Sequence, residues 1–180
     1  MKIKLIALAL LFSVGVFAQK LSTRTGYVKF FSEAPVENIE AANKQVSSVI
    51  NTENGEFAFL VPIKGFQFEK ALMQEHFNEN YMESGKFPNC TFKGTISNFS
   101  EVDFTKDGTY RATFSGVMTL HGVEKKMEEK ATITVKDGKV TLSSEFKIRP
   151  EDYGVEIPAG KKDNISSVIE VTVKISYDKK

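Results

Sequence analysis

The sequence has little cysteine and no tryptophan. The shortage of cysteine limits the covalent cross-links that could stabilise the fold. Among its 180 residues only Cys90 carries a thiol. A single cysteine excludes an internal disulfide, and the C-x-x-C pairs typical of zinc and redox sites are absent as well. The stability of the fold must therefore come from apolar burial and hydrogen-bonded backbone. The default interpretation of Cys90, at the start of a predicted strand, is a buried structural thiol.

The sequence also lacks an excess of charge of either sign. It contains 24 Lys and Arg against 23 Asp and Glu. A balance of this kind does not attract nucleic acid or an anionic lipid surface, so no nucleic-acid partner is expected. There is no linker, low-complexity tract or internal repeat, and a chain of this length is typical of one domain.

The one long apolar run lies at the amino terminus and predicts a secretory signal peptide. Lys2 and Lys4 precede an uncharged stretch over residues 5–17, and Val16 and Ala18 stand at the −3 and −1 positions of a signal-peptidase site. We expect residues 1–18 to be removed, which leaves a domain of residues 19–180 in the periplasm or outside the cell. The run is shorter than the ~20 residues of a membrane span, so the mature chain is not expected to span a membrane. Without Lys2 and Lys4 it carries 22 basic and 23 acidic residues, a formal charge of −1.

Signatures of the common enzyme classes are absent. The sequence contains no G-x-S-x-G, H-E-x-x-H, Walker loop or G-x-G-x-x-G. His76 and His121 lie on separate elements without ligand spacing, so we expect local hydrogen bonds and neither a metal nor a cofactor. Glu75 and Glu79 share one face of a predicted helix, which keeps a hydrolase-type enzyme as an alternative. A solvated helix face is the more ordinary interpretation.

Most of the chain alternates apolar and polar residues with a period of two, which predicts β-strands with one dry face. In the stretch 109–120, for example, Phe114 falls on the apolar face and Thr113 on the polar face. Eight segments show the pattern, the first two less regularly: 26–32, 45–51, 56–68, 90–96, 109–120, 127–135, 140–148 and 166–177. A "KDG" turn, residues 136–138, predicts a hairpin between two of them.

Eight consecutive amphipathic strands predict an all-β fold, an eight-stranded antiparallel barrel, because closure removes exposed sheet edges. A β-sandwich is the alternative. One segment breaks the period. Leu72, Met73, Phe77 and Tyr81 predict a short helix over about 68–81, ended by Gly85 and Pro88, that lies near the barrel mouth as a lid.

The interior of the predicted barrel is rich in phenylalanine, of which the chain has fifteen. An eight-stranded barrel is either just filled by side chains or holds one small elongated ligand, and composition alone leaves both open. A filled-core structural or adaptor module therefore stays an alternative. An integral outer-membrane barrel is disfavoured by outer faces dense in Lys, Glu and Thr and by the lack of aromatic girdles.

Several motifs resemble the YceI-like family of lipocalin-like periplasmic proteins. The strand end typical of that family is matched by Thr119, Leu120, His121, Gly122, Val123 and Lys125, and its turn by Arg149, Asp152, Tyr153 and Gly154 with one extra residue. The likeness spans nearly the whole mature chain, with a departure in the helical segment 73–88. The resemblance implies a lipocalin-like barrel whose apolar tunnel binds a polyisoprenoid or similar amphiphilic lipid, often as a homodimer and without catalysis.

The candidate binding residues follow from the strand faces and from the helix. The apolar lumen is expected to comprise Phe57, Phe59, Val61, Phe92, Ile96, Phe114, Met118, Ile133, Leu142, Phe146, Ile169, Val171 and Val173. The lid and rim are expected to comprise Met73, His76, Phe77, Asn80 and Tyr81. There His76, Asn80 and Tyr81 would meet the polar head of a ligand, while Glu75 and Glu79 face solvent.

Overall fold

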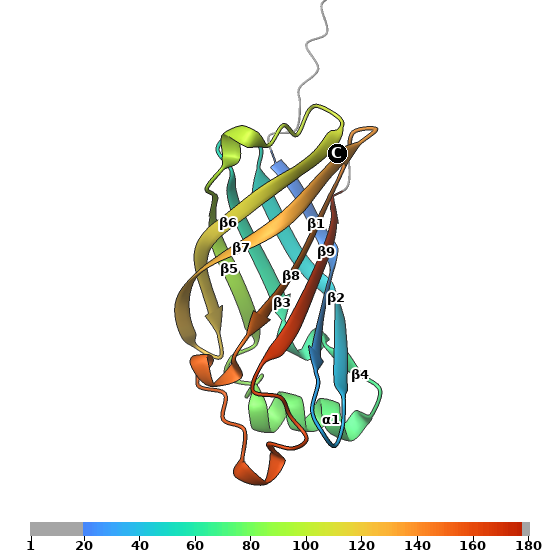
Figure 1. Ribbon diagram of the computed structural model, residues 1–180, viewed down its shortest axis with the longest axis vertical. Helices are drawn as coiled ribbons and strands as arrows, with labels where there is room; N and C mark the ends of the chain where they lie inside the picture. Colours follow the sequence, from blue (N-terminus) through green and yellow to red (C-terminus); the bar gives the residue numbers. More distant parts are fainter. Residues whose placement is uncertain (1–19, 178–180) are drawn as a thin grey trace, which may run out of the picture.

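The computed structural model describes residues 20–177, and the predicted signal peptide lies outside this range. These residues form one antiparallel sheet (Figure 1). Its strands are β1 (Lys20–Ser32), β2 (Ile39–Asn51), β3 (Glu56–Pro62), β4 (Gln67–Phe68), β5 (Asn89–Ile96), β6 (Gly108–Leu120), β7 (Val123–Lys136), β8 (Lys139–Ile148) and β9 (Ile169–Tyr177).

The sheet closes into a barrel. Its strands lie in the order β1-β9-β8-β7-β6-β5-β3-β2, and a further pairing of β1 with β2 joins the two ends. β4 adds only two residues, against Ala41 and Ala42 of β2. The predicted eight-stranded antiparallel barrel is thus confirmed, and the sandwich is excluded.

The strand faces and the hairpin turn between β7 and β8 agree with the pattern in the sequence. In β6 Phe114 is 3% exposed and points inward, whereas its neighbour Thr113 lies on the other face. Asp137 and Gly138, between β7 and β8, have φ values of 51° and 70°. Positive φ at both central residues is the geometry of the tight turn that matches the twist of a hairpin.

The boundaries of several elements differ from the prediction. The segment 56–68 is not one strand, because β3 ends at Pro62, which has no N–H to continue the ladder. A 3-10 turn, Ile63–Gly65, and β4 follow. The first two strands are longer than predicted, since register shifts beside Gly26 interrupt their alternation. The helix is shorter: α1 covers Ala71–His76 and continues as a π-helical turn over Phe77–Tyr81.

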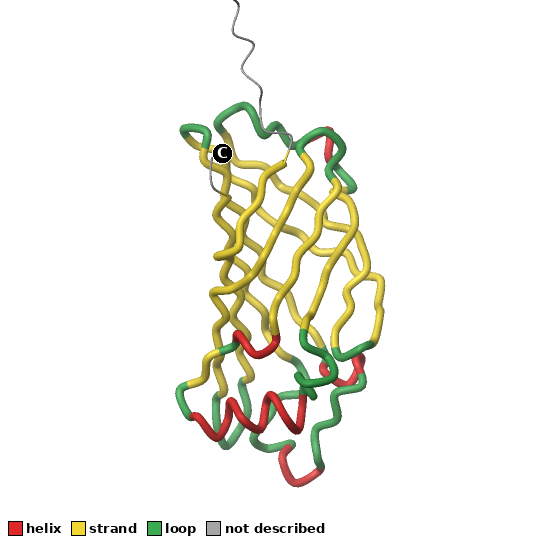
Figure 2. Tube along the Cα trace, turned by 180° about the vertical axis from the view of Figure 1, so that it is seen from behind, coloured by secondary structure: helices red, strands yellow, loops and turns green. Residues whose placement is uncertain are grey.

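The two ends of the barrel differ. At one end lie α1, the β1–β2 loop and the long β8–β9 connection, which carries the 3-10 turns Pro150–Tyr153 and Ala159–Lys161 (Figures 1 and 2). The opposite end is filled by side chains such as Ile50, Ile133 and Tyr177, each at most 1% exposed. The barrel is therefore solid at one end and covered by helical segments at the other.

Candidate ligand cavity

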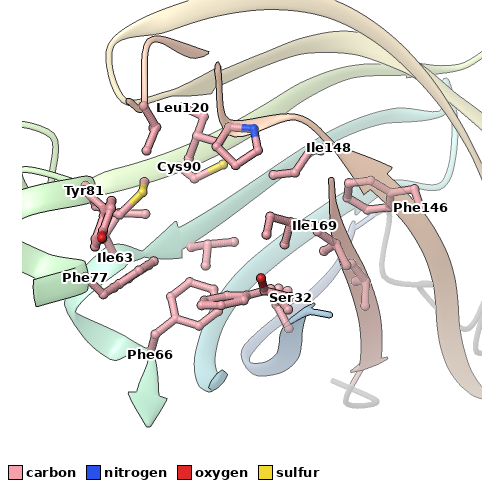
Figure 3. A pocket seen from close by; sticks show the side chains of 18 of the residues that line it. Ser32, Ile63, Phe66, Phe77, Tyr81, Cys90, Leu120, Phe146, Ile148 and Ile169 are labelled. Carbon is pink, nitrogen blue, oxygen red and sulfur yellow. The ribbon is translucent and has the colours of Figure 1, made fainter. Parts of the chain in front are cut away.

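A cavity of about 340 Å³ occupies the barrel. Side chains from strands, from the helix and from the β8–β9 connection converge on it, as Figure 3 shows for Phe66, Phe77 and Ile169. Its lining is almost wholly apolar. Small-molecule sites in proteins typically enclose ~300–1,000 Å³ behind such a lining. The structure thus combines the two interiors that composition left open, a filled core at one end and a cavity toward the other.

Most of the residues predicted for the lumen line this cavity. Ten do so: Phe59, Val61, Phe92, Phe114, Met118, Leu142, Phe146, Ile169, Val171 and Val173. Three do not. Phe57, Ile96 and Ile133 point inward as predicted, but they are buried in the filled core. Alternation reports which face of a strand is dry, but it does not report the height along the barrel at which the interior changes from filled to hollow.

The helix contributes one side of the cavity. Met73, Phe77 and Tyr81, four residues apart along the helix, line it together with His76. Two expectations were wrong. Leu72 is 60% exposed and does not belong to the stripe that covers the barrel, and Asn80 is exposed and lies outside the lining.

A cluster of phenylalanines holds the helix against the barrel. The Phe77 ring centroid lies 5.4 Å from that of Phe30, 5.6 Å from that of Phe66 and 5.1 Å from that of Phe68. Lys70, just before α1, also forms an ion pair with Glu37 of the β1–β2 loop at 2.6 Å. The lid is therefore anchored by an aromatic cluster as well as by its backbone connections.

Other lining residues were missed by the sequence analysis. Leu120 and Ile148 fall on strand faces whose alternation had been recognised, so the same signal was available for them. Val155, Ile157 and Ile165 come from the β8–β9 connection, where no periodic pattern marks a buried face. Ser32 is a buried polar member of the lining, and its hydroxyl accepts a hydrogen bond from the Ser166 backbone N–H at 2.9 Å.

Burial shifts the ionisation of three lining residues. It raises the pKa of the Cys90 thiol to about 12. Burial also raises the pKa of the Tyr81 hydroxyl and that of the Glu129 carboxyl. In each case removal from water disfavours the charged form. Within this lining Cys90 is an uncharged thiol at neutral pH, in agreement with the structural role expected for it.

His121 makes the local hydrogen bonds that its position suggested. Its Nε2 lies 3.0 Å from Glu83 Oε2, its Nδ1 lies 3.2 Å from the Tyr153 carbonyl oxygen, and its ring packs edge-on against Phe87 with centroids 4.6 Å apart. The ring thus ties the β6–β7 turn to the segment after the helix. Within residues 20–177 no three His, Cys, Asp or Glu side chains are grouped as ligands for a metal ion.

The two carboxylates of the enzyme alternative lie away from the cavity. Glu75 and Glu79 are exposed and border a shallow outer depression together with Lys64 and Lys86. Within the described part of the chain, no helix has the length and apolar character needed to cross a membrane.

Comparison with solved structures finds the same barrel in other proteins. The polyisoprenoid-binding domain of a Saccharophagus degradans protein implicated in plant cell wall breakdown matches with a TM-score of 0.77 and 14% identity, over 90% of this chain and 99% of that one. Burkholderia cenocepacia BcnA matches with a TM-score of 0.69 and 12% identity, over 84% and 95%. The Campylobacter jejuni YCEI protein matches with a TM-score of 0.55 and 17% identity, over 100% and 92%. At these identities the likeness establishes the fold alone.

A comparison with curated protein sequences found no match. A family model, by contrast, covers nearly the whole chain: the YceI-like domain matches residues 17–177. This match agrees with the motifs around His121 and Tyr153 and with the barrel itself. The chain belongs to the YceI-like domain family.

Proposed function

We propose that this protein is a periplasmic or secreted binding protein that holds the apolar chain of a polyisoprenoid or similar amphiphilic lipid in its barrel. The observation that carries the proposal is the cavity of about 340 Å³ with its apolar lining. Water in such a space makes few hydrogen bonds, and its replacement by an apolar chain is favourable. The similarity to a polyisoprenoid-binding domain supports the same class of ligand.

The shape of the interior favours binding over a purely structural role. A filled-core module would pack the barrel to both ends, whereas here Phe59, Phe92 and Phe146 are only half-buried around the cavity. The hydrolase alternative receives no such support, because Glu75 and Glu79 lie outside the cavity, on an exposed outer depression. We therefore propose binding without catalysis.

The amino-terminal sequence supports export as part of the proposal. Residues 1–18 have the charged, apolar and small-residue regions of a signal peptide. Exported protein should begin at Gln19. Amino-terminal sequencing that finds Met1 on exported protein would contradict this. The homodimer implied by the family resemblance is checked by sedimentation of the same material.

Native mass spectrometry of the protein purified from its own envelope tests the binding function. We expect a bound mass that organic solvent removes and that a long-chain isoprenoid restores. As a matched control, a Phe114→Glu protein that is still folded should carry no lipid, because a carboxylate would enter the apolar lumen. Native protein that arrives empty and takes up no isoprenoid or other long apolar chain would overturn the proposal.

A further inference from the structure

The barrel wall is split between β7 and β8. Their ladder runs from the hairpin turn to the pair Thr132 and Ser143 and ends there. Beyond this rung, residues 123–131 of β7 pair only with β6, and residues 144–148 of β8 pair only with β9. Figure 1 shows the two strands diverging from their hairpin toward the end that carries α1. We call this unpaired stretch the β7–β8 seam.

The exposure of inward-facing side chains changes at the seam. On β7 Ala131, Ile133 and Val135 are buried, whereas Met127 and Glu129, which face the same way, are half-buried. On β8 Val140 and Leu142 are buried, whereas Ser144, Phe146 and Ile148 are half-buried. All five half-buried side chains line the cavity. The inward-facing side chains beside the unpaired stretch therefore border the cavity.

Glu129 is an unusual member of this lining. It faces inward opposite Phe114 in the β6–β7 ladder, and within residues 20–177 no hydrogen bond or ion pair joins its carboxylate to another residue. Lys125, inward-facing on the same strand, is engaged elsewhere: its Nζ lies 3.1 Å from Asp152 Oδ1 and 5.6 Å from the centre of the Tyr153 ring. A partly desolvated carboxylate without a partner is costly, and a ligand that supplies a hydrogen-bond donor offsets that cost.

Ser144, across the seam, adds a second acceptor. Its hydroxyl donates to the Lys130 carbonyl oxygen at 2.7 Å, which fixes the oxygen at the first unpaired level of the two strands. Because the proton is used, the oxygen retains lone pairs that can accept a hydrogen bond. The basic side chains of the lining, His76 and Lys161, belong instead to the helix and to the β8–β9 connection. The seam thus offers acceptors to a ligand that carries hydrogen-bond donors, whereas an anionic ligand would be repelled by the Glu129 carboxylate.

We propose that the polar end of the bound amphiphile lies in the β7–β8 seam against Glu129, with the tail in the cavity. The head group is then a hydrogen-bond donor, either a neutral alcohol or a cationic amine, and not a phosphate or carboxylate. This inference rests on the proposed lipid-binding function and deepens it. It also moves the head-binding site from the helix side, where His76 and Tyr81 lie, to the strands.

Four ligands that share a branched twenty-carbon tail separate the head from the tail. Exported protein stripped of lipid is titrated at neutral pH with geranylgeraniol, geranylgeranylamine, geranylgeranyl phosphate and the headless alkane phytane, and displacement of a fluorescent apolar probe reports binding. We expect the alcohol and the amine to bind at least about tenfold more tightly than the phosphate, the size of effect that one hydrogen bond to a charged group supports.

Glu129→Gln is the decisive variant. It should weaken binding of the amine by about tenfold and strengthen binding of the phosphate. The affinity for phytane should stay within about twofold of that of the native protein. Glu124→Gln, on the same strand but exposed on its outer face, should change none of the four. Melting curves and the unchanged phytane affinity confirm that each variant is folded.

The remaining outcomes decide against the inference in distinguishable ways. If Glu129→Gln leaves the order of the four ligands unchanged while His76→Ala with Tyr81→Phe weakens the alcohol and amine, the head lies beside the helix and the seam proposal is wrong. If all four ligands bind to every variant with the same affinity, the head group makes no specific contact, and only the seam proposal fails. If none binds, phytane included, the proposed function fails together with it.

Discussion

The hydroxyl oxygens of Ser48 and Tyr177 lie 2.7 Å apart in the filled end of the barrel, where both side chains are buried. The two residues are 129 positions apart in the chain, on β2 and β9, which flank β1. Each is the other's hydrogen-bond partner in a region that water does not reach. Burial also raises the pKa of the Tyr177 hydroxyl, so the pair stays neutral and hydrogen-bonded in mildly alkaline solution.

Tyr177→Phe should lower the free energy of unfolding by about 1–3 kcal/mol, because the buried Ser48 hydroxyl loses its partner. Urea unfolding measures the change. Tyr110→Phe is the matched control: its hydroxyl donates to the Lys106 carbonyl at 2.9 Å in an exposed position, so its loss should cost less. Equal costs for the two variants would show that burial of the Ser48 and Tyr177 pair has no energetic consequence.

A second prediction concerns the contact between β5 and β6, where Gly94 and Gly116 are cross-strand partners. A Cβ on Gly94 would overlap the Ser115 carbonyl oxygen, which is backbone and cannot turn aside. Gly94→Ala should therefore separate the strands and lower the thermal midpoint by several degrees, as a loss of about 1–3 kcal/mol does for a domain of this size. Gly85→Ala, where a Cβ meets nothing within 4 Å, should leave the midpoint nearly unchanged.

A third prediction compares the two faces of β6. Phe114 packs with its ring centroid 4.8 Å from that of Phe57, and its replacement by Glu removes this packing and forces a carboxylate among apolar side chains. The loss should be at least about 3 kcal/mol. Thr113→Glu, on the outer face opposite Lys130, should be nearly neutral. Chemical denaturation of both proteins checks the contrast, and similar losses would mean that the side-chain faces of β6 have been exchanged.

The strand faces could be predicted because alternation is a local property of a half-buried strand. Phe114, Leu142 and Val171 were placed inward from their neighbours alone, and the structure agrees. The closure of the sheet followed from the number of amphipathic strands. The family resemblance added the lipocalin-like form of the barrel.

The limits of the cavity could not be predicted in the same way. Whether an inward residue such as Ile133 meets a packed core or an empty space depends on side chains from other strands, which no local pattern encodes. Ile157 and Ile165 reach the cavity from an irregular connection without a period. Glu129 was assigned to neither face of its strand, because a carboxylate at an inward position runs against the alternation. The sequence also offered no signal for the place where the β7–β8 ladder ends beside it.

A fourth prediction concerns His121, which joins the β6–β7 turn to Glu83 behind the helix. His121→Asn keeps a residue type that tolerates the φ of 51° at this position but loses the bridge to the carboxylate. Backbone amides of residues 73–84 should then exchange with deuterium about tenfold faster, because the helix opens more readily, while amides of β6 should change less. His76→Asn is the control, since the His76 side chain is exposed. Equal acceleration in both variants would remove the bridge as the cause.

The last prediction concerns Cys90, whose thiol has a pKa raised to about 12 by burial. In the unfolded chain a thiol titrates near 8.5, so the unfolded state releases its proton first as the pH rises. The stability that this neutral thiol contributes is therefore complete below about pH 8.5 and falls as the pH rises toward 12. Cys90→Ala should show a shallower decline of unfolding free energy between pH 8.5 and 9.5 than the native protein, measured by urea unfolding. The tyrosines with raised pKa values add a decline of the same sign above their ordinary value near 10, so the comparison is made below that pH.

Alkylation of native Cys90 by a maleimide at pH 8 should likewise be slow, and slower still when an isoprenoid fills the cavity that the thiol lines. Rapid alkylation that an isoprenoid does not slow, together with parallel pH profiles, would place the thiol in contact with water and outside the binding space.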